Sequence, residues 1–185
     1  MNNDLIETLK DGGIAVIPTD TIYGIVGSAL NPQTVEKIYE LRKRAKDKPF
    51  IILISSIGDM KQFDIELTNN QRKFLEKHWP NPLSVVLSCR SERFKHLHRG
   101  TNSLAFRMPK KVKLLFLLKQ VGPLVAPSAN FEAEKPAENI EIAKAYFGNQ
   151  VSFYLDGGTI YSTPSTLVKF DQNSLKILRQ GDFKI

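Results

Sequence analysis

A run of cations interrupts the apolar pattern of the sequence and is the first feature with chemical potential. Five cations lie within seven residues, namely Arg42, Lys43, Arg44, Lys46 and Lys48. Because the residue before a proline is disfavoured in a helix, Pro49 predicts an extended exit, with alternate residues from 42 to 48 on one side. Charge-assisted hydrogen bonds from such a row would hold a triphosphate. The alternative is a solvated helix end whose cations interact with the helix dipole.

A second motif, PSAN at residues 127–130, offers hydrogen bonds without charge. In an extended or turn geometry, Ser128 and Asn130 project to the same side, where they suit phosphate oxygens or a ribose. The alternative is a helix N-cap or an Asx-turn. Ser165 and Arg179 are further polar residues near the ends of predicted strands, and each is a weak signal by itself.

Arg107 lies inside an apolar strand pattern, which is an unusual place for a cation. A buried guanidinium needs an acidic partner or a ligand carboxylate or phosphate, and the sequence supports the two equally. Residues 12–27, GGIAVIPTDTIYGIVG, supply another candidate wall. An apolar strand at 14–17 is ended by Pro18, and Thr19, Asp20 and Thr21 follow it. This pattern indicates either the floor of a binding site or a strand followed by a turn.

The elements that must position these residues alternate irregularly between helix and strand. Apolar spacing and capping residues predict helices from Leu5, from Asn31-Pro32, from Thr68 to His78, over 112–120 and over 137–147. Strands are expected at 14–17, 50–54, after Pro82, at 103–108, 124–126 and 153–155. Residues 165–170 and 175–178 indicate a hairpin around 171–173. The order favours an α/β fold with a twisted, mixed sheet, parallel and antiparallel, and helices on its faces.

Composition indicates a globular protein and favours an anionic partner, although a basic surface can also serve solubility alone. Its 185 residues fit one domain over residues 1–185, and the formal net charge of +7 favours a nucleotide, an RNA or both. The single Cys89 indicates a buried thiol and a reducing compartment. No signal peptide or run of about 20 apolar residues is present, which predicts a cytoplasmic protein without a membrane partner. His96 and His98 are interpreted as surface residues, so no metal site is expected.

Seven motifs, in this order, resemble the YrdC/TsaC family of threonylcarbamoyl-AMP synthases. They are PTDTIYG (18–24), RKRAKDKPF (42–50), WPNPLS (79–84), AFRMP (105–109), APSAN (126–130), PSTLV (164–168) and RQG (179–181). The resemblance covers residues 13–181 and is to the short form of the family, without its additional C-terminal domain. It implies a twisted α/β sheet around a large, basic concave cavity. It also implies an enzyme that converts L-threonine, bicarbonate and ATP into L-threonylcarbamoyladenylate and pyrophosphate.

The resemblance also assigns roles to individual residues. It implies that ATP is held by Arg42, Arg44, Lys48, Ser128, Asn130 and Arg179, and that threonine or its carbamate is held by Thr21, Arg107 and Ser165. Mg²⁺ would arrive with ATP, and Arg42, Arg44 and Arg107 would act through charge and positioning without a covalent nucleophile. A threonylcarbamoyl-transferase complex would then pass the group to an adenosine beside the tRNA anticodon.

Five residues depart from the family pattern. Ala45 stands where proline is common, and Asn81 stands where the turn often has glycine. The other three concern charge or the contact with threonine. Arg42 replaces a lysine, Leu53 a histidine placed near threonine in some members, and Lys169 an aspartate. Two other functions remain open at this point. One is a non-enzymatic RNA-binding module that uses the same basic cavity, and the other is a carbamoyl-phosphate-related domain of a larger maturation enzyme. The small polar set of Thr21, Ser128, Asn130 and Ser165 favours the synthase, because an RNA binder would instead want exposed aromatic side chains for stacking.

Overall fold

A single mixed sheet organises the computed structural model, which describes residues 2–171 and 174–185. Within these residues the sheet has nine strands in the order β7-β1-β2-β6-β3-β5-β4-β8-β9. The pairs β1–β7, β3–β5 and β4–β8 are parallel, and the remaining pairs are antiparallel. The predicted mixed α/β sheet is therefore confirmed.

The strands occupy nearly the positions that the sequence predicts. Their bounds are β1 Ala15–Pro18, β2 Tyr23–Ser28, β3 Ile51–Leu53, β4 Leu83–Ser88, β5 Ser103–Arg107, β6 Leu124–Val125, β7 Phe153–Tyr154, β8 Thr166–Asp171 and β9 Ser174–Arg179. β8 and β9 form the predicted hairpin, while Gln172 and Asn173 of its expected turn lie outside the described residues. β2 was not predicted, because Gly24 and Gly27 interrupt its apolar residues and glycine is depleted in strands.

Two helices begin at the capping residues that predict them, whereas the helix expected over 137–147 begins only at Ile140, after its N-cap Asn139. The α-helices are α1 Asn3–Lys10, α2 Pro32–Leu41, α3 Asn69–His78, α4 Lys95–His98, α5 Val112–Val121 and α6 Ile140–Phe147, and the 3₁₀ helices are η1 Ile57–Phe63, η2 Glu92–Phe94 and η3 Gly148–Gln150. Asn31 caps α2, with Pro32 at its first position. Thr68 and Gln71 form the predicted capping box of α3.

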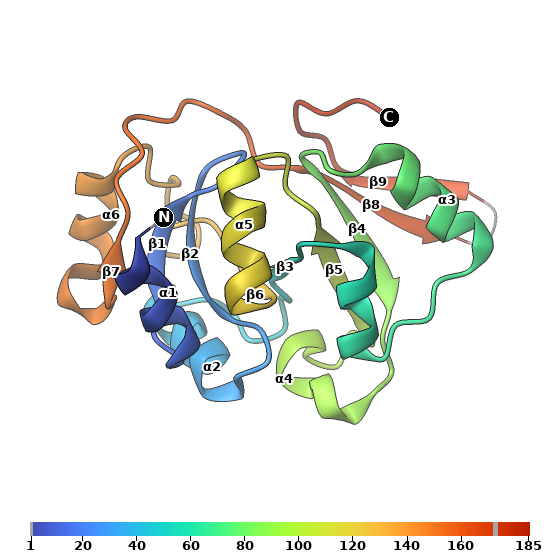
Figure 1. Cartoon of the computed structure of the whole chain (residues 1–185), viewed down its shortest axis with the longest axis horizontal. Coiled ribbons are helices and arrows are strands. Elements are labelled where there is room, and N and C mark those ends of the chain that lie inside the picture. The colour runs from blue at the N-terminus through green and yellow to red at the C-terminus, as the bar shows by residue number, and fades with distance from the viewer. Residues whose placement is uncertain (1, 172–173) are drawn as a thin grey trace.

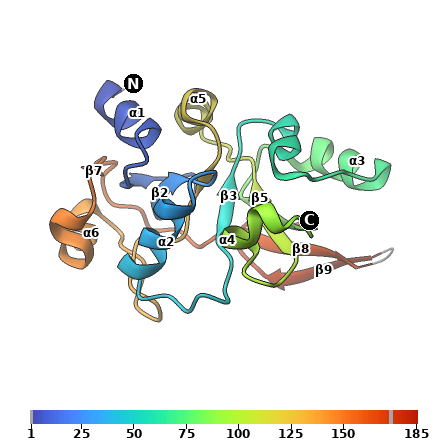
Figure 2. The same cartoon turned by 90° about the horizontal axis from the view of Figure 1, so that it is seen from below.

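Two apolar clusters hold the helices against the sheet. α1 and α5 contribute Leu5, Leu9, Leu114 and Leu117 to the smaller cluster, which packs on β1 and β2. Figures 1 and 2 show α1, α5 and α3 on one side of the sheet. The larger cluster includes α2 and the residues around α4. No helix of the described residues is both long and apolar enough to cross a membrane.

Residues 90–99 are not the loop that the sequence suggests. They contain η2 and α4, and helical turns place Phe94 and Leu97 in the larger apolar cluster. The surface interpretation of the two histidines is therefore wrong. His98 is only 1% exposed, and His96 is partly buried with its ring nitrogen 3.1 Å from the carbonyl oxygen of Ala29. Cys89 is buried, as predicted.

Candidate active site

Four arginines converge on one cavity, which is lined by Arg42, Arg44, Arg107 and Arg179. Hydroxyl groups of Thr19, Thr21, Ser128 and Ser165 complete its polar wall. None of its lining residues, all in the described part of the chain, is an aspartate or a glutamate. The cavity volume is about 200 Å³, below the roughly 300–1,000 Å³ of drug-sized ligand pockets. The enclosed part therefore suits a small anionic group, and a larger ligand would extend beyond it.

The turn between β1 and β2 forms one wall of this cavity. The Thr19 hydroxyl donates to the carbonyl oxygen of Ile22 at 2.7 Å and accepts from the backbone N–H of Thr21 at 3.1 Å. Gly24 forms a β-bridge with Ser128, which brings the two motifs together. A Cβ atom added at Gly24 would lie 3.2 Å from Thr19 Cγ2, so the site requires the close approach that glycine allows.

Arg107 has the internal acidic partner that a cation in an apolar strand requires. Its Nη2 lies 3.2 Å from Asp20 Oδ1 in an ion pair whose side chains are only 5% and 4% exposed. Its Nη1 donates to Thr21 Oγ1 at 3.3 Å, while its Nε has no hydrogen-bond partner. Burial lowers the pKa of Arg107, and Asp20 opposes that shift. The salt bridge thus exists, and Arg107 also lines the cavity.

Arg42 turns back from the end of α2 and binds the PSAN motif. Its Nε donates to the carbonyl oxygen of Asn130 at 3.1 Å, and its Nη2 donates to Ser128 Oγ and Asn130 Oδ1 at 3.2 and 3.1 Å. Nη1 is buried without a partner. Burial, and next the charge of Arg44, lower the pKa of Arg42 to about 10, so the guanidinium stays charged at neutral pH. The two N–H groups of Nη1 thus have no acceptor among the described residues, while the guanidinium as a whole brings its positive charge to the cavity wall.

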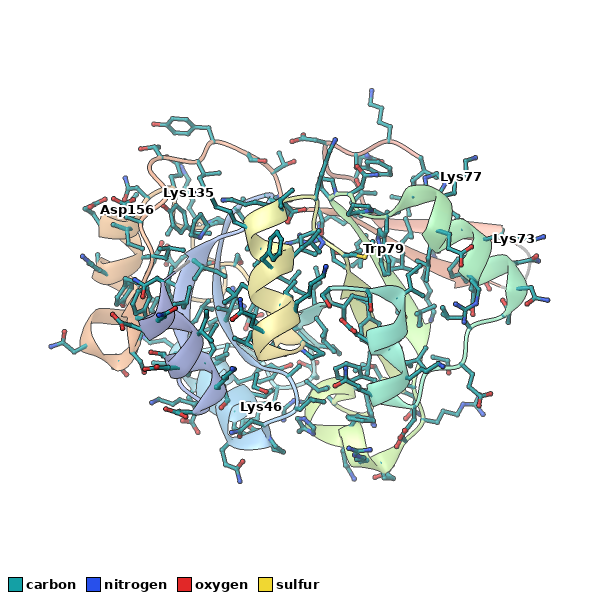
Figure 3. The ribbon with its side chains drawn as sticks, in the orientation of Figure 1. Lys46, Lys73, Lys77, Trp79, Lys135 and Asp156 are labelled. Carbon is teal, nitrogen blue, oxygen red and sulfur yellow. The ribbon has the colours of Figure 1, made fainter. Side chains whose placement is uncertain are left out.

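The expectation of an extended segment after α2 is wrong. Residues 42–48 fold into turns, with Lys43 at a φ of 50°, so alternate side chains do not share one side. Arg42 and Arg44 line the cavity, whereas Lys46 pairs with Glu36 of α2 at 3.4 Å and lies beside that helix in Figure 3. Lys48 pairs with Glu132 at 2.7 Å and is not a lining residue. The contacts of Arg42 with PSAN set this course, since they require the chain to fold back.

The ends of β8 and β9 supply the last wall. Arg179 donates from Nε and Nη2 to the carbonyl oxygen of Ser165 at 3.1 and 2.9 Å. The Ser165 hydroxyl lies 2.8 Å from that of Ser84 and accepts from Arg179 Nη2 at 3.3 Å. Burial, and next the neighbouring charges of Arg107 and Arg44, lower the pKa of Arg179. Mutual repulsion among these cations is a strain that a bound anion would relieve.

Gly181 is expected to be essential to this wall. A Cβ atom added there would lie 2.7 Å from Thr166 N and 2.9 Å from Ser165 C, so the backbone would have to move. We expect Gly181→Ala to lower the free energy of unfolding by about 1–3 kcal/mol, as overpacking does. The control is Gly58→Ala, whose Cβ atom meets only Ser56 Oγ at 3.5 Å and should change stability little. Urea denaturation of both variants measures the difference, and equal stability would show that the wall tolerates displacement.

Sequence reasoning located the walls but not every role within them. Asn130 is 4% exposed and is not a lining residue, because its side chain holds Arg42 and accordingly faces away from the cavity. Asp20 and Tyr23 were part of the stretch interpreted as a candidate binding-site floor, but neither was given a role of its own. The Tyr23 hydroxyl accepts from Gly157 N–H at 2.8 Å and donates to Gly158 O at 2.7 Å, which attaches a distant loop to the site. The DTIY pattern next to Pro18 carried the signal for both residues.

Two of the departures from the family pattern, Leu53 and Lys169, lie outside the cavity. Leu53 is fully buried in the smaller apolar cluster. Lys169 is exposed on β8, where it is paired in register with Lys176. Neither is among the residues that line the cavity, so neither alters its inner surface directly.

A second, larger cavity of about 580 Å³ lies elsewhere and has a different character. Its walls are mostly apolar, with three charged residues, and it contains none of the predicted site residues; Leu5, Ile17, Leu114, Phe116, Leu117, Lys111, Lys113 and Asp156 are among its lining residues. The smaller cavity is the candidate active site, because size alone is no substitute for convergent polar groups.

Comparison with known protein families shows which proteins this chain is similar to. The model of the Sua5/YciO/YrdC family, described as telomere recombination, matches residues 7–181. A Mycobacterium tuberculosis relative is 28% identical over 177 residues, which are 95% of this chain and 82% of the relative. The Bacillus subtilis threonylcarbamoyl-AMP synthase is 27% identical over 94% of this chain, which spans about half, 51%, of that protein.

Solved structures agree with the sequence comparison. Pyrococcus abyssi Sua5, in a crystal structure complexed with L-threonine, superposes with a TM-score of 0.88 at 27% identity. The match covers 96% of this chain and 53% of that one, so this chain again corresponds to about half of its relative. Escherichia coli YciO has a TM-score of 0.87 at 19% identity, covering 98% of this chain and 89% of the other, and its likeness concerns the fold alone.

Proposed function

The chain belongs to the Sua5/YciO/YrdC family, and from that premise we propose that it is a threonylcarbamoyl-AMP synthase. In the proposed reaction, the amine of L-threonine combines with bicarbonate to give an N-carboxylate and water. The carboxylate oxygen then attacks the α-phosphorus of ATP, and the bond to pyrophosphate breaks. The products are L-threonylcarbamoyladenylate and pyrophosphate.

The observation that carries this proposal is the cavity with four arginines and no lining carboxylate. Bicarbonate and ATP are anions, and threonine carries a carboxylate. The repulsion between these negative charges is the main obstacle to bringing the reactants together. The nucleophile comes from the substrate, so the reaction requires no activated serine, cysteine or histidine. Such a transfer depends on positioning and on stabilisation of negative charge, which fixed guanidinium groups provide.

We assign threonine or its carbamate to the wall formed by Thr21, Arg107 and Ser165. Arg107 is suited to the threonine carboxylate, because it is a cation on the cavity wall and Asp20 fixes the orientation of its guanidinium. The hydroxyls of Thr21 and Ser165 can donate or accept, as recognition of the threonine hydroxyl and of the carbamate requires. In this assignment Asp20 is a positioning residue.

We assign the nucleotide to Arg42, Arg44, Arg179 and Ser128, with Lys48 at the outer end. The charges of Arg42 and Arg179 on the cavity wall would offset the negative charge that develops around the α-phosphorus. We assign Asn130 a supporting role and not the direct contact with ATP that the family resemblance implies. Because its side chain accepts from Arg42 Nη2, it supports ATP binding by holding that arginine rather than by contact.

We propose that magnesium enters as part of the ATP substrate. Mg²⁺ prefers oxygen ligands and retains several waters, usually with one or two carboxylates and the substrate phosphates. The cavity wall offers it no carboxylate, and no cluster of three or more acidic, histidine or cysteine residues that could hold a metal occurs in the described ranges. The phosphates and water would therefore supply its ligands, and its charge would assist the departure of pyrophosphate.

We further propose that the adenylate is consumed by a threonylcarbamoyl transferase that modifies tRNA. A mixed anhydride of a carbamate and a phosphate is activated toward nucleophiles, so its natural successor is a group-transfer reaction. The net charge of +7 is compatible with an RNA nearby, although charge alone does not separate an enzyme from an RNA-binding module.

Product analysis tests the proposal directly. The protein is incubated with ATP, Mg²⁺, L-threonine and ¹³C-bicarbonate, and the mixture is analysed by mass spectrometry. The expected result is threonylcarbamoyladenylate that carries the label in its carbamoyl carbon. Labelled product in the complete mixture, absent without protein, would support the proposal. An RNA complex without any adenylate product would favour the non-enzymatic RNA-binding module instead.

A further inference from the structure

Glu132 occupies a position that the proposed reaction does not explain. It lies two residues after Asn130, and its backbone N–H donates to the carbonyl oxygen of Arg42 at 2.8 Å. Its carboxylate accepts from Lys48 Nζ and from the backbone N–H of Ala45, both at 2.7 Å. Arg44 Nη1 is 4.0 Å from the same carboxylate. Glu132 therefore contacts the basic segment at four points.

The three groups around this carboxylate are those of a phosphate site. A backbone N–H, an ammonium and a guanidinium converging on one position form the usual donor set for a phosphate oxygen. Arg44 also lines the cavity, so the position adjoins the candidate active site. The hydrogen bond from Lys48, and next that from Ala45, lower the pKa of Glu132, so its carboxylate is ionised at neutral pH.

The contact is also accessible to an incoming ligand. The side chains of Glu132 and Lys48 are 24% and 54% exposed, and the next residue, Ala133, is exposed with a φ of 69°. An exposed ion pair is weak, so a ligand of higher charge can replace it without disrupting the core.

We infer that Glu132 holds the place of the terminal phosphates of the nucleotide and is displaced when they bind. This inference rests on the proposed function, in which Arg44 and Lys48 receive those phosphates. Because a carboxylate competes for the same cations, the ligand must bring more charge than the single charge of Glu132. Glu132 thereby lowers the affinity for a triphosphate without affecting that for a monophosphate, which does not reach this position, and it keeps the basic segment ordered when no nucleotide is bound.

The variant Glu132→Gln separates charge from shape. A glutamine oxygen can still accept from Ala45 N–H, but it does not compete electrostatically for Lys48 and Arg44. We expect the Kd of Mg-ATP to fall about fivefold to tenfold, and that of AMP to change less than about twofold, since AMP lacks the terminal phosphates. Isothermal titration calorimetry on the full chain measures both. If Glu132→Gln does not fold, Glu132→Ala replaces it, with the same direction expected.

Glu134→Gln is the matched control, because it removes an equal charge two residues away. Its side chain makes no hydrogen bond or ion pair within residues 2–171 and 174–185. An equal fall in the Kd of Mg-ATP in Glu134→Gln, or an equal fall in the Kd of AMP and Mg-ATP in Glu132→Gln, would show that the effect comes from the net charge of the protein. Either result would overturn the inference. Unchanged or weaker ATP binding in Glu132→Gln would instead make the contact a structural brace.

The binding measurement also distinguishes this inference from the proposed reaction. A wild-type protein that binds ATP but forms no adenylate would contradict the reaction and leave the comparison of variants valid. A wild-type protein that binds neither ATP nor inorganic triphosphate would overturn the inference, because no phosphate site would then exist for Glu132 to occupy.

Discussion

Replacing Arg107 by methionine is expected to have the largest effect of any single substitution in the site. Asp20 would remain buried without its cation, and breaking a buried pair in this way costs about 3–5 kcal/mol of stability. Loss of the contact to the threonine carboxylate is expected to lower kcat/KM for threonine by about 100- to 1,000-fold. Denaturant melts and steady-state kinetics measure the two effects separately.

The double variant Arg107→Met with Asp20→Asn separates folding from function. Removing both charges should recover most of the lost stability, because no uncompensated carboxylate remains. The amide oxygen introduced by Asp20→Asn can still accept from Lys110 N–H, as the Asp20 carboxylate does at 3.2 Å. Activity should stay at the level of the single variant. If turnover recovers together with stability, Arg107 supports the fold only, and the assignment of threonine to this wall is wrong.

Arg42→Met is expected to have the second largest effect. It removes a buried cation and the three hydrogen bonds that join the end of α2 to Ser128 and Asn130. We expect the free energy of unfolding to fall by about 2–4 kcal/mol and the Kd of ATP to rise about 10- to 100-fold. Chemical denaturation and calorimetric titration test the two parts of this expectation.

Two control variants test whether the effect of Arg42→Met comes from the position and shape of this side chain. Lys43→Met removes the neighbouring charge, whose ammonium lies over the ring of Phe131 at 4.2 Å and not on the cavity wall, so ATP binding should change little. Arg42→Lys keeps the charge but not the planar fork, and should bind ATP better than Arg42→Met while remaining less stable than the wild type. Similar ATP affinities for Arg42→Met and Lys43→Met would remove Arg42 from the nucleotide site.

Local signals in the sequence predicted much of the fold. Asn31 and Pro32 marked the start of α2, Thr68 and Gln71 that of α3, and the apolar run after Pro49 gave β3. These features succeed because capping and apolar periodicity act within a few residues. β2 was missed, because Gly24 and Gly27 break up its apolar residues, and glycine is depleted in strands.

The site residues were located by their motifs, but their contacts were beyond sequence reasoning. Arg42 binds Asn130 across 88 positions of the chain, and Lys48 meets Glu132 across 84. Such pairs are set by tertiary packing, which no local pattern encodes. The segment after α2 was therefore predicted to be an extended row of cations. In the structure its arginines line the cavity, whereas Lys46 pairs with Glu36 and Lys48 pairs with Glu132.

Release of pyrophosphate is the measurement that tests the central claim most directly. The wild-type protein is supplied with ATP and Mg²⁺, and L-threonine and bicarbonate are added separately and together. The account predicts release only when both are present, because the carbamate is the nucleophile. Release that does not require threonine would contradict the assigned substrate, and the absence of release from folded protein under every condition would contradict the synthase reaction itself.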